Sequence, residues 1–517
     1  METKKLQLLV TSDIHGYLLP TTYRRTVEPL GLVKLASIIE ELREQRPSLI
    51  IDNGDLIQGS PLASYYHANH TDSPNPIIEV ANFLKYDVAI FGNHEFNYGL
   101  PFLKKAVTQS QFPWLSGNIF YEDGAAFTKP YIVKELDGVR IGIIGVTTHF
   151  IPIWEEASHI EGLDFHDAFE SAKIWISHIR QNEHVDLVVL CYHGGFSHDL
   201  SSGELIEPFT GENQGYLMCK ELDCDILITG HQHREIATKA FAKTVVQPGT
   251  KGNCLAVITI DLDIQDGQII NKHHEATLHY VDETTHNHPN IASLLDNIHQ
   301  QTENWLDQPI GRIEGNMLFT DAFQVRIDKH PYIEFIQNVQ MASTNTSISC
   351  TALFHDGSGG FPNNVTMRHI VTNYIFPNTL KVLRVKGEQI IQALEQNATY
   401  FSLKDGELTI SKSFLHPKAQ PYNYDMWEGI DYTLDIRRPF GERVTEVTYQ
   451  GKPLNLNTFY DVVMNNYRAT GAGNFPYFVD CPIINDVQID MTELIARYFE
   501  KNPIVQAKCR RNWTILY

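Results

Sequence analysis

Short apolar runs alternate with longer amphipathic segments along the first half of the chain. Segments such as residues 31–45 and 167–181 repeat apolar positions with a helical period, and the runs between such segments are rich in β-branched residues. Alternation of this kind predicts an α/β domain over about residues 1–285. The runs that predict strands are LQLLVTS (6–12), SLIIDN (48–53), DVAIF (87–91), RIGIIGV (140–146), DLVVLCY (186–192), DILITG (225–230), TVVQPG (244–249) and CLAVITIDL (254–262).

The pattern changes after about residue 285. Residues 286–307 predict a single helix that links two domains, because apolar positions recur along it with few turn signals. Residues 308–517 mix helical stretches such as 387–401 with strands such as 443–451, which predicts a second, α+β domain. A chain of 517 residues is long enough for two or three domains.

Composition narrows the function classes. The chain is 43% hydrophobic and 20% charged, which is typical of a soluble globular protein. Its net charge of −21 argues against a nucleic-acid polymer or an anionic membrane as partner, although a local metal cluster could still attract a phosphate. The first apolar run is too short for a signal peptide, and no run approaches a membrane span of about 20 residues. We therefore expect a cytoplasmic protein, and its oligomeric state is not predicted.

The seven cysteines are scattered and form no CxxC pair. Neither a disulfide framework nor a thiolate zinc site is therefore expected.

Polar side chains follow the predicted strands of the first half, each at the point where an apolar run stops. Because the carboxyl ends of strands gather the sites of α/β folds, we expect these side chains to meet. The motifs are TSDIHG, DNGDLIQG, GNHEF, CYHGG and TGHQHRE, and they contribute Asp13, His15, Asp55, Asn93, His94, His193, His231 and His233.

Without His94, these motifs supply more oxygen and nitrogen donors than one ion needs. Two ions that share a bridging carboxylate would use all of them. Donors without sulfur suit zinc, manganese or iron and disfavour softer metals such as copper(I). A glycine precedes Asp55, Asn93 and His231, which lets the backbone turn sharply beside a crowded charge. The sequence therefore predicts two divalent metal ions.

This set of motifs resembles the calcineurin-like metallophosphoesterases. Further stretches in both halves, NGDLIQGSPLASYY, YIFPNTLKV, YNYDMWEGIDYTLDI and NNYRATGAGNF, resemble the 5'-nucleotidase family, and within it the 2',3'-cyclic-nucleotide 2'-phosphodiesterase/3'-nucleotidase branch. The resemblance implies an αββα sandwich that performs the chemistry and a C-terminal α+β domain that grips the nucleotide. It also implies that Asp13, His15 and His233 hold one ion, that Asn93, His193 and His231 hold the other, and that Asp55 bridges them.

The same resemblance makes His94 a catalytic group that is not itself a ligand. It can hydrogen-bond the developing charge or protonate the leaving oxygen. Many 5'-nucleotidases have an aspartate three residues later that orients this histidine, and here the position is Asn97. An amide can hold the imidazole but cannot stabilise its charged form in the same way. This departure weakens the 5'-nucleotidase interpretation more than it weakens catalysis.

Base recognition is expected in the second half. The resemblance places one stacking aromatic in YNYDMWEG and one in NNYRATGAGNF, which we assign to Tyr422 and Tyr467, with Tyr424 as the alternative to Tyr422. Many 5'-nucleotidases also carry a GGxR stretch, whereas this chain has Phe361 and Pro362 directly after the glycines. That difference again favours the cyclic-nucleotide branch.

The sequence therefore predicts metal-dependent hydrolysis of nucleotide phosphoesters. The preferred reaction converts 2',3'-cyclic nucleotides to 3'-nucleotides and then releases the 3'-phosphate. The alternatives are a 5'-nucleotidase acting on nucleoside mono- or diphosphates, and a nucleotide-binding protein that has lost catalysis, for which Asn97 is the only support.

Overall fold

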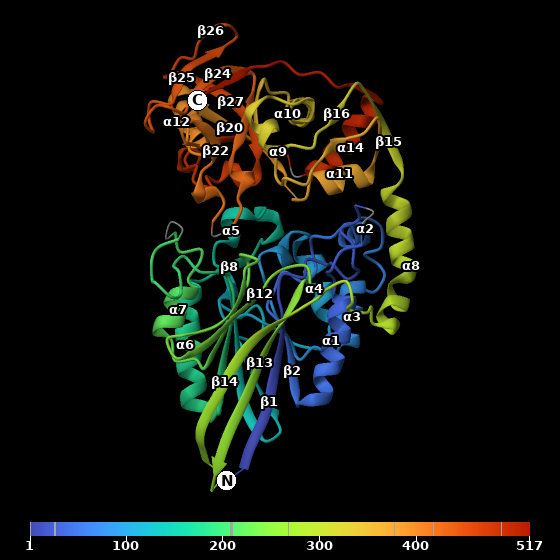
Figure 1. The fold of residues 1–517 in the computed structure, drawn as a ribbon, viewed down its shortest axis with the longest axis vertical. Helices are drawn as coiled ribbons and strands as arrows, with labels where there is room; N and C mark the ends of the chain where they lie inside the picture. The colour runs from blue at the N-terminus through green and yellow to red at the C-terminus, as the bar shows by residue number, and fades with distance from the viewer. Residues whose placement is uncertain are drawn as a thin grey trace. The chain divides into compact units, whose positions relative to one another are not determined.

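The computed structural model describes residues 2–24, 27–206, 210–266, 268–376, 378–416, 418–487 and 489–517. The chain divides into two compact units, Met1–Thr302 and Glu303–Tyr517. Helix α8 (Pro289–Leu306) contains the boundary between them (Figure 1). Within the described residues, no helix is long and apolar enough to cross a membrane.

The first unit is built on two six-stranded sheets. In order across the first sheet lie β14 (Gln268–Tyr280), β13 (Cys254–Gln265), β1 (Glu2–Thr11), β2 (Ser48–Asp52), β3 (Val88–Ile90) and β4 (Trp114–Leu115). In order across the second lie β11 (Glu235–Ala240), β12 (Lys243–Pro248), β10 (Ile226–Thr229), β9 (Leu187–His193), β7 (Val139–Thr147) and β6 (Tyr131–Leu136). A short pair, β5 (Ile119–Tyr121) and β8 (Leu163–Phe165), lies outside both sheets.

Helices cover the outer faces of this pair of sheets, on opposite sides of the unit in Figure 1. On one side lie α1 (Leu32–Gln45), α2 (Pro61–Asn69), α3 (Pro76–Phe83) and α4 (Gly99–Gln109), and on the other lie α6 (Ala168–Asn182) and α7 (Gly215–Glu221). A one-turn helix, α5 (Ile151–Trp154), follows β7. Fully buried residues of both sheets, such as Leu8 and Val189, share one apolar cluster, which is the core between the sheets. This is the expected αββα sandwich.

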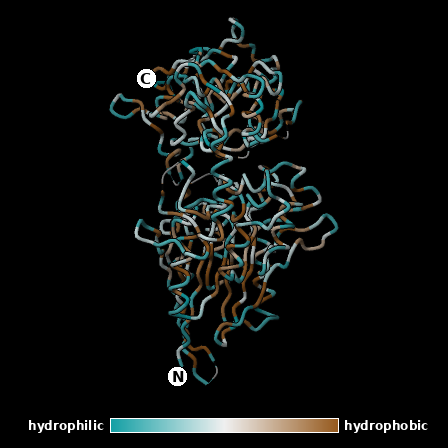
Figure 2. The backbone as a smooth tube through the Cα atoms, turned by 90° about the vertical axis from the view of Figure 1, so that its right-hand side faces the viewer, coloured by the Kyte–Doolittle hydropathy of each residue, from teal (hydrophilic) through white to brown (hydrophobic). Residues whose placement is uncertain are grey.

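Strand direction explains where polar side chains gather. Strands β1, β2, β3 and β4 run parallel to one another, and so do β7, β9, β10 and β12. All the polar motifs noted above begin at or just after the carboxyl ends of these parallel strands. Figure 2 shows the hydrophobic stretches of this unit gathered in its interior.

The second unit has a mixed α+β architecture. Its five-stranded sheet has the order β23 (Asp425–Glu428), β17 (Ile348–Ala352), β27 (Phe459–Asn465), β20 (Leu380–Lys386) and β28 (Ile483–Val487). Smaller sheets contain β19 (Asn364–Thr366), β15 (Pro309–Glu314) and β29 (Ile504–Gln506); β26 (Lys452–Pro453), β25 (Val444–Tyr449), β24 (Ile430–Asp435) and β30 (Trp513–Leu516); β16 (Met317–Leu318) and β18 (Gly360–Phe361); and β21 (Phe401–Lys404) and β22 (Glu407–Ile410). The helices are α9 (Ala322–Ile327), α10 (Pro331–Thr344), α11 (Met367–Asn373), α12 (Gly387–Ala398), α13 (Asn466–Ala469) and α14 (Met491–Lys501).

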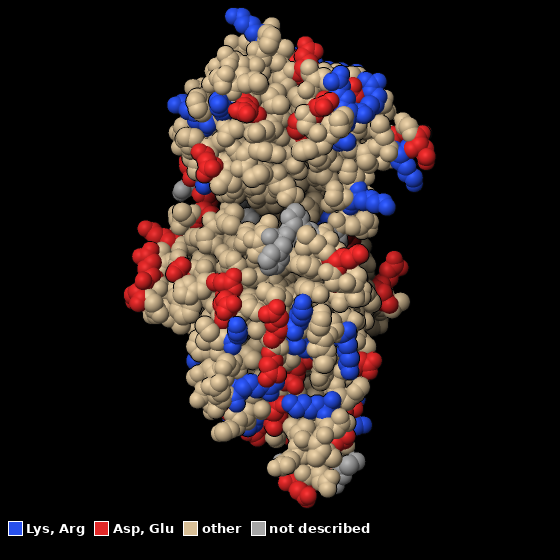
Figure 3. All heavy atoms as spheres, turned by 90° about the vertical axis from the view of Figure 1, so that its left-hand side faces the viewer, with Lys and Arg blue, Asp and Glu red and all other residues tan. Residues whose placement is uncertain are grey.

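The predicted α/β fold class is confirmed, with its sandwich in the first unit and its α+β part in the second. On the face shown in Figure 3, acidic side chains are spread over both units and interleaved with Lys and Arg. The excess of negative charge is therefore not gathered into a single patch on that face.

Candidate metal centre

One group of donors joins the ends of two strands from different sheets. Asp13 and His15 follow β1, and His233 follows β10. Nε2 of His233 lies 3.4 Å from Oδ1 of Asp13 and 3.1 Å from Nε2 of His15. The ligand atoms of the three side chains all lie within 4.8 Å of one another, so they could hold one ion.

A second group lies beside the first. It comprises Asp55, His193 and His231, whose ligand atoms also lie within 4.8 Å of one another. Nε2 of His193 is 3.1 Å from Oδ2 of Asp55, and Oδ1 of Asn93 is 2.9 Å from Nδ1 of His231. The same Asp55 oxygen is 3.8 Å from Nε2 of His15 in the first group. Asp55 therefore lies where a carboxylate shared between the groups would have to be.

The backbone is held in an unusual conformation at this centre. Non-glycine residues rarely adopt positive φ, and each costs about 1–3 kcal/mol unless the surroundings enforce it. The φ angles are 54° at Asp13, 52° at His15, 57° at Asp55, 68° at His231 and 56° at His233. Strain concentrated in five donors indicates that their directions serve a site and not the fold alone.

Two glycines make room for the crowded carboxylate. A Cβ on Gly92 would lie 2.3 Å from Oδ1 of Asp55, and one on Gly54 would lie 2.6 Å from Nδ1 of His193. No larger residue fits at either position without displacing a donor. The glycines before Asp55 and Asn93 therefore provide space as well as a turn.

The remaining ring nitrogens show that the donors suit a metal ion. Nδ1 of His193 donates to the carbonyl of Asn53 at 2.7 Å, and Nδ1 of His15 to that of Gln58 at 3.0 Å. Outer hydrogen bonds of this kind make Nε2 the nitrogen that can bind a metal ion once it is free of its proton. The buried Nε2 of His193 lies 3.1 Å from the Asp55 carboxylate, so one cation could bind both groups.

His231 is oriented in the opposite sense, with Nδ1 toward Asn93. Its Nε2 lies 2.9 Å from Oε1 of Glu212. Because a carboxylate only accepts hydrogen bonds, Nε2 carries the proton and Nδ1 is left as the metal-binding atom. Sequence reasoning missed Glu212, which precedes His231 by 19 residues in a loop without a motif.

Both buried aspartates remain ionised. Burial alone would raise the pKa of Asp13, but the hydrogen bond from His233 and the charge of His193 lower it to about 2. Burial also opposes ionisation of Asp55, yet His193 and His94 hold its pKa well below the usual range. Each group of donors therefore contains one ionised carboxylate, whose charge protonated histidines such as His193 balance here and a divalent cation would balance in their place.

Glu95 holds the backbone around the centre in place, and sequence reasoning did not predict this role. Its carboxylate accepts backbone N–H groups from Gly92 at 2.6 Å, Asp55 at 2.8 Å, Leu56 at 2.7 Å and Ile57 at 3.2 Å. Burial and the nearby charge of Asp55 raise the pKa of Glu95 to about 7. This side chain fastens the Asp55 turn to the end of β3. Its place directly after His94 in GNHE was the available signal.

His94 lies beside the donors and outside both groups. It begins a single 3₁₀ turn (His94–Phe96), and its backbone N–H donates to Oδ1 of Asp55 at 2.8 Å. Its ring centroid is 5.1 Å from that of His15. Nδ1 lies 2.6 Å from Oδ1 of Asn97. The structure thus brings Asn97 and His94 into direct contact at the edge of the centre.

The second unit brings Tyr422 and Tyr467 together. Both rings are partly exposed, their centroids lie 6.3 Å apart, and their planes meet at 81°. The two rings therefore meet edge to face. Tyr424 is different: its side chain is buried, stacks on Tyr400 and donates from its hydroxyl to the carbonyl of Arg326 at 3.1 Å.

Arg468 connects the two short segments that carry these tyrosines, and it was not predicted. Its Nη2 donates to the carbonyl of Tyr422 at 3.1 Å, and Nη1 donates to the carbonyl of Ala472. Nε makes a 2.6 Å ion pair with Asp425, and both of these side chains are almost fully buried. Phe361, at the position that distinguishes this chain from many 5'-nucleotidases, is buried in the apolar core and offers no polar group.

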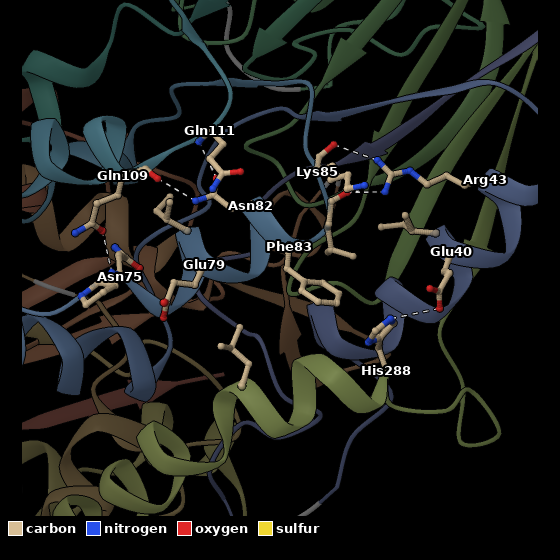
Figure 4. A pocket seen from close by; sticks show the side chains of 15 residues that line it. Glu40, Arg43, Asn75, Glu79, Asn82, Phe83, Lys85, Gln109, Gln111 and His288 are labelled. Atoms are coloured by element: carbon tan, nitrogen blue, oxygen red, sulfur yellow. Dashed lines mark hydrogen bonds and ion pairs between the residues drawn. The ribbon is translucent and has the colours of Figure 1, made fainter.

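A cavity of about 880 Å³ lies elsewhere in the first unit, between α1, α3 and the start of α8 (Figure 4). None of the predicted site residues lines it. Several of its polar groups pair with one another or with backbone: Arg43 donates to the carbonyl of Leu84 at 2.6 Å, and Nε2 of His288 lies 3.3 Å from Glu40. It offers no constellation comparable to the donor groups.

Comparison with known proteins places both units. Residues 6–235 match calcineurin-like phosphoesterases, and residues 309–480 match the C-terminal domain of 5'-nucleotidases. A 2',3'-cyclic-nucleotide 2'-phosphodiesterase/3'-nucleotidase of Yersinia enterocolitica is 30% identical, over 99% of this chain and 88% of that protein. The trifunctional nucleotide phosphoesterase protein YfkN of Bacillus subtilis is 27% identical over 99% of this chain, which spans only 39% of that relative.

A solved structure is also similar. A Staphylococcus aureus protein provisionally named a 5'-nucleotidase, in complex with alpha-ketoglutarate, has a TM-score of 0.92 and 36% identity to this chain. The match covers 99% of this chain and 100% of that one.

Proposed function

We propose that this chain, which belongs to the 5'-nucleotidase family, hydrolyses nucleotide phosphoesters with the help of divalent metal ions. Its first unit is a calcineurin-like phosphoesterase unit, and its second is a 5'-nucleotidase C-terminal unit. The preferred substrates are 2',3'-cyclic nucleotides, which are converted to 3'-nucleotides and then to nucleosides. The observation that carries this proposal is the meeting of two donor groups around Asp55.

Asp13, His15 and His233 would hold one ion, and Asn93, His193 and His231 the other, with Asp55 shared between them. Oxygen and nitrogen donors of this kind suit manganese, zinc or iron. Ions bound there would polarise the phosphoryl oxygens and activate a water for attack on phosphorus.

The chain's own residues then act on the substrate. His94 stands at the edge of the donor groups with its Nδ1 occupied by Asn97, so Nε2 is the nitrogen that meets the ester. With a second proton on Nε2, it would donate a hydrogen bond to the negative charge that builds on the phosphoryl group, or pass that proton to the leaving ribose oxygen. Tyr422 and Tyr467 would contact the base. Of the two candidates on the first loop, Tyr422 is favoured because Tyr424 is buried and already hydrogen-bonded.

A 5'-nucleotidase is the second candidate, supported by the name of the Staphylococcus aureus protein. Asn97 and the buried Phe361 are features of this chain that favour the cyclic-nucleotide reaction over it.

Side-by-side kinetics test the proposal. The protein is stripped with a chelator, reloaded separately with Mn²⁺, Zn²⁺ or Fe²⁺, and assayed with 2',3'-cyclic AMP, 3'-AMP and 5'-AMP. We expect the highest kcat/KM for 2',3'-cyclic AMP and no turnover without metal. A preference for 5'-AMP would establish the second candidate. Binding of all three nucleotides with hydrolysis of none, under every metal, would leave only a nucleotide-binding protein.

A further inference from the structure

Asn97 stands between His94 and a second polar side chain, Glu155. Its Oδ1 is 2.6 Å from Nδ1 of His94, and its Nδ2 donates to Oε2 of Glu155 at 2.6 Å. A carboxylate accepts hydrogen bonds and does not donate them, so the Asn97 atom that faces Glu155 must be the amide nitrogen. The amide oxygen then faces His94, and Nδ1 of His94 must carry a proton. Glu155 therefore determines the orientation of Asn97, and Asn97 determines the tautomer of His94.

Glu155 is itself held in place. It follows α5 directly, and its side chain is 7% exposed. Oε1 accepts the backbone N–H of Glu156 at 2.9 Å and lies 2.9 Å from Nδ1 of His159. Both carboxylate oxygens thus have donors, and the carboxylate cannot turn away from Asn97 without losing them. An anchored charge at the end of a hydrogen-bond chain is the arrangement that orients a histidine.

We propose that Glu155 is a positioning residue for His94, acting through Asn97. The hydrogen-bond chain holds the His94 ring with Nδ1 protonated, so that Nε2 is the nitrogen that takes up a second proton and gives it to the leaving ribose oxygen. It also supplies, one residue further out, the negative charge that an aspartate at position 97 would supply directly. This inference rests on the proposed function, since it gives His94 its role in ester hydrolysis.

The sharpest test moves the negative charge from position 155 to position 97. Glu155→Gln keeps an acceptor for Asn97 but removes the charge. Asn97→Asp alone places two carboxylates against each other where a 2.6 Å hydrogen bond now lies. The double variant Asn97→Asp/Glu155→Gln restores a connected chain, because the introduced glutamine can donate to the introduced aspartate, which in turn can accept from His94. Coupled residues reveal themselves by such non-additive rescue.

The activity measurement compares two leaving groups. Hydrolysis of 3'-AMP expels a ribose oxygen that needs a proton, whereas p-nitrophenyl phosphate expels a stable phenolate that does not. Each single variant should lose about 10- to 100-fold in kcat on 3'-AMP, the usual cost of losing an outer hydrogen-bond partner. It should lose much less on p-nitrophenyl phosphate, with unchanged metal content. The double variant should recover most of the wild-type kcat on 3'-AMP.

A matched control is Asp164→Asn, which breaks an exposed carboxylate–histidine pair of similar length, 3.0 Å to His166, and should leave both activities unchanged. A readout without turnover is the ¹⁵N spectrum of the His94 ring in the metal-free chain. We expect the Nδ1–H tautomer in the wild type and a loss of that preference in Asn97→Ala.

An Nε2–H tautomer in the wild type would overturn the proposal. So would a double variant no more active than the weaker single variant, or equal losses on both substrates, which would mark Glu155 as merely structural. Failure of the proposed function looks different: the wild type would hydrolyse neither ester under any metal, and both proposals would fall.

Discussion

The two units hold their functional side chains by opposite means. In the first unit, the donors lie at or just after the ends of buried strands, and five of them are directed by a backbone at positive φ. In the second unit, Tyr422 lies in a single 3₁₀ turn (Pro421–Asn423) and Tyr467 in the one-turn helix α13, and one buried side chain, Arg468, bonds to the segments that carry both. When the backbone fixes the direction of a metal ligand, substitution of that ligand is expected to disrupt the metal site. In the second unit, by contrast, a substitution can weaken binding of the nucleotide base in part without abolishing it.

The largest expected effect tests the first side of this contrast. Asp55→Asn removes the charge shared between the two donor groups and should abolish turnover of every substrate, small or large. Asp52→Asn is the matched control: Asp52 is equally buried, burial raises its pKa well above the usual range, and it belongs to neither donor group. Steady-state assays should find most activity retained in that control. Substantial turnover by Asp55→Asn would show that the centre does not depend on a shared carboxylate.

His94→Ala should come next. Loss of a group that transfers a proton costs about 10²–10⁴ in rate. Metal content should stay near the wild-type value, because His94 lies outside both donor groups. Elemental analysis alongside kcat makes the distinction. A variant that loses metal together with activity would place His94 among the ligands and would blur the division between donors and catalytic group.

The donors of the first unit could be predicted because each lies near the end of an apolar run, which is visible in the sequence. Asp13, Asp55 and His193 each end an apolar run, and parallel strands bring such ends together. Their orienting partners carry no such signal. Glu155 reaches Asn97 across 58 residues of sequence, and Glu212 lies in a loop. Contacts of this kind depend on how loops pack, which no local pattern encodes.

The second unit was predicted only in outline. The tyrosines were found through resemblance, since partly exposed and buried tyrosines look alike in sequence, and only the structure separates Tyr422 from Tyr424. Arg468 directly follows Tyr467, but its burial and its ion pair with Asp425 are results of tertiary packing. A buried arginine is rare enough that sequence reasoning assigns such a residue to the surface.

Arg468→Met tests whether this arginine holds the two tyrosine-bearing segments together. Removing one partner of a buried ion pair leaves an uncompensated charge on Asp425 and should cost about 3–5 kcal/mol of stability. The double variant Arg468→Met/Asp425→Leu removes both charges and should be less destabilised. Chemical unfolding of the full chain measures both. If the double variant is no more stable than the single one, the charge of Asp425 is not what Arg468 balances.

Tyr467→Ala should affect recognition and spare the chemistry. A stacking ring is worth about 1–3 kcal/mol per base, or about one to two powers of ten in affinity. KM for 2',3'-cyclic AMP should rise accordingly, while hydrolysis of bis-p-nitrophenyl phosphate, which has no base, changes by less than about threefold. Tyr449→Ala is the control, because Tyr449 makes a similar edge-to-face pair with Tyr460 at 5.3 Å outside the two loops. Equal losses on both substrates would assign Tyr467 to the fold.

The smallest effect separates the two tyrosines of the first loop. Tyr424→Phe removes a buried hydroxyl that donates to the carbonyl of Arg326 at 3.1 Å. It should therefore cost about 0.5–1.5 kcal/mol of stability, the net worth of one hydrogen bond. Because the ring remains and lies inside the core, KM for 2',3'-cyclic AMP should not change. Tyr422→Ala should show the reverse, a higher KM for the cyclic nucleotide with little loss of stability, since its ring is partly exposed. Unfolding midpoints and KM values for the two variants decide between them. A raised KM in Tyr424→Phe with an unchanged unfolding midpoint would assign the base contact to Tyr424. The base would then be bound by a residue of the core, and not by the two segments that Arg468 connects.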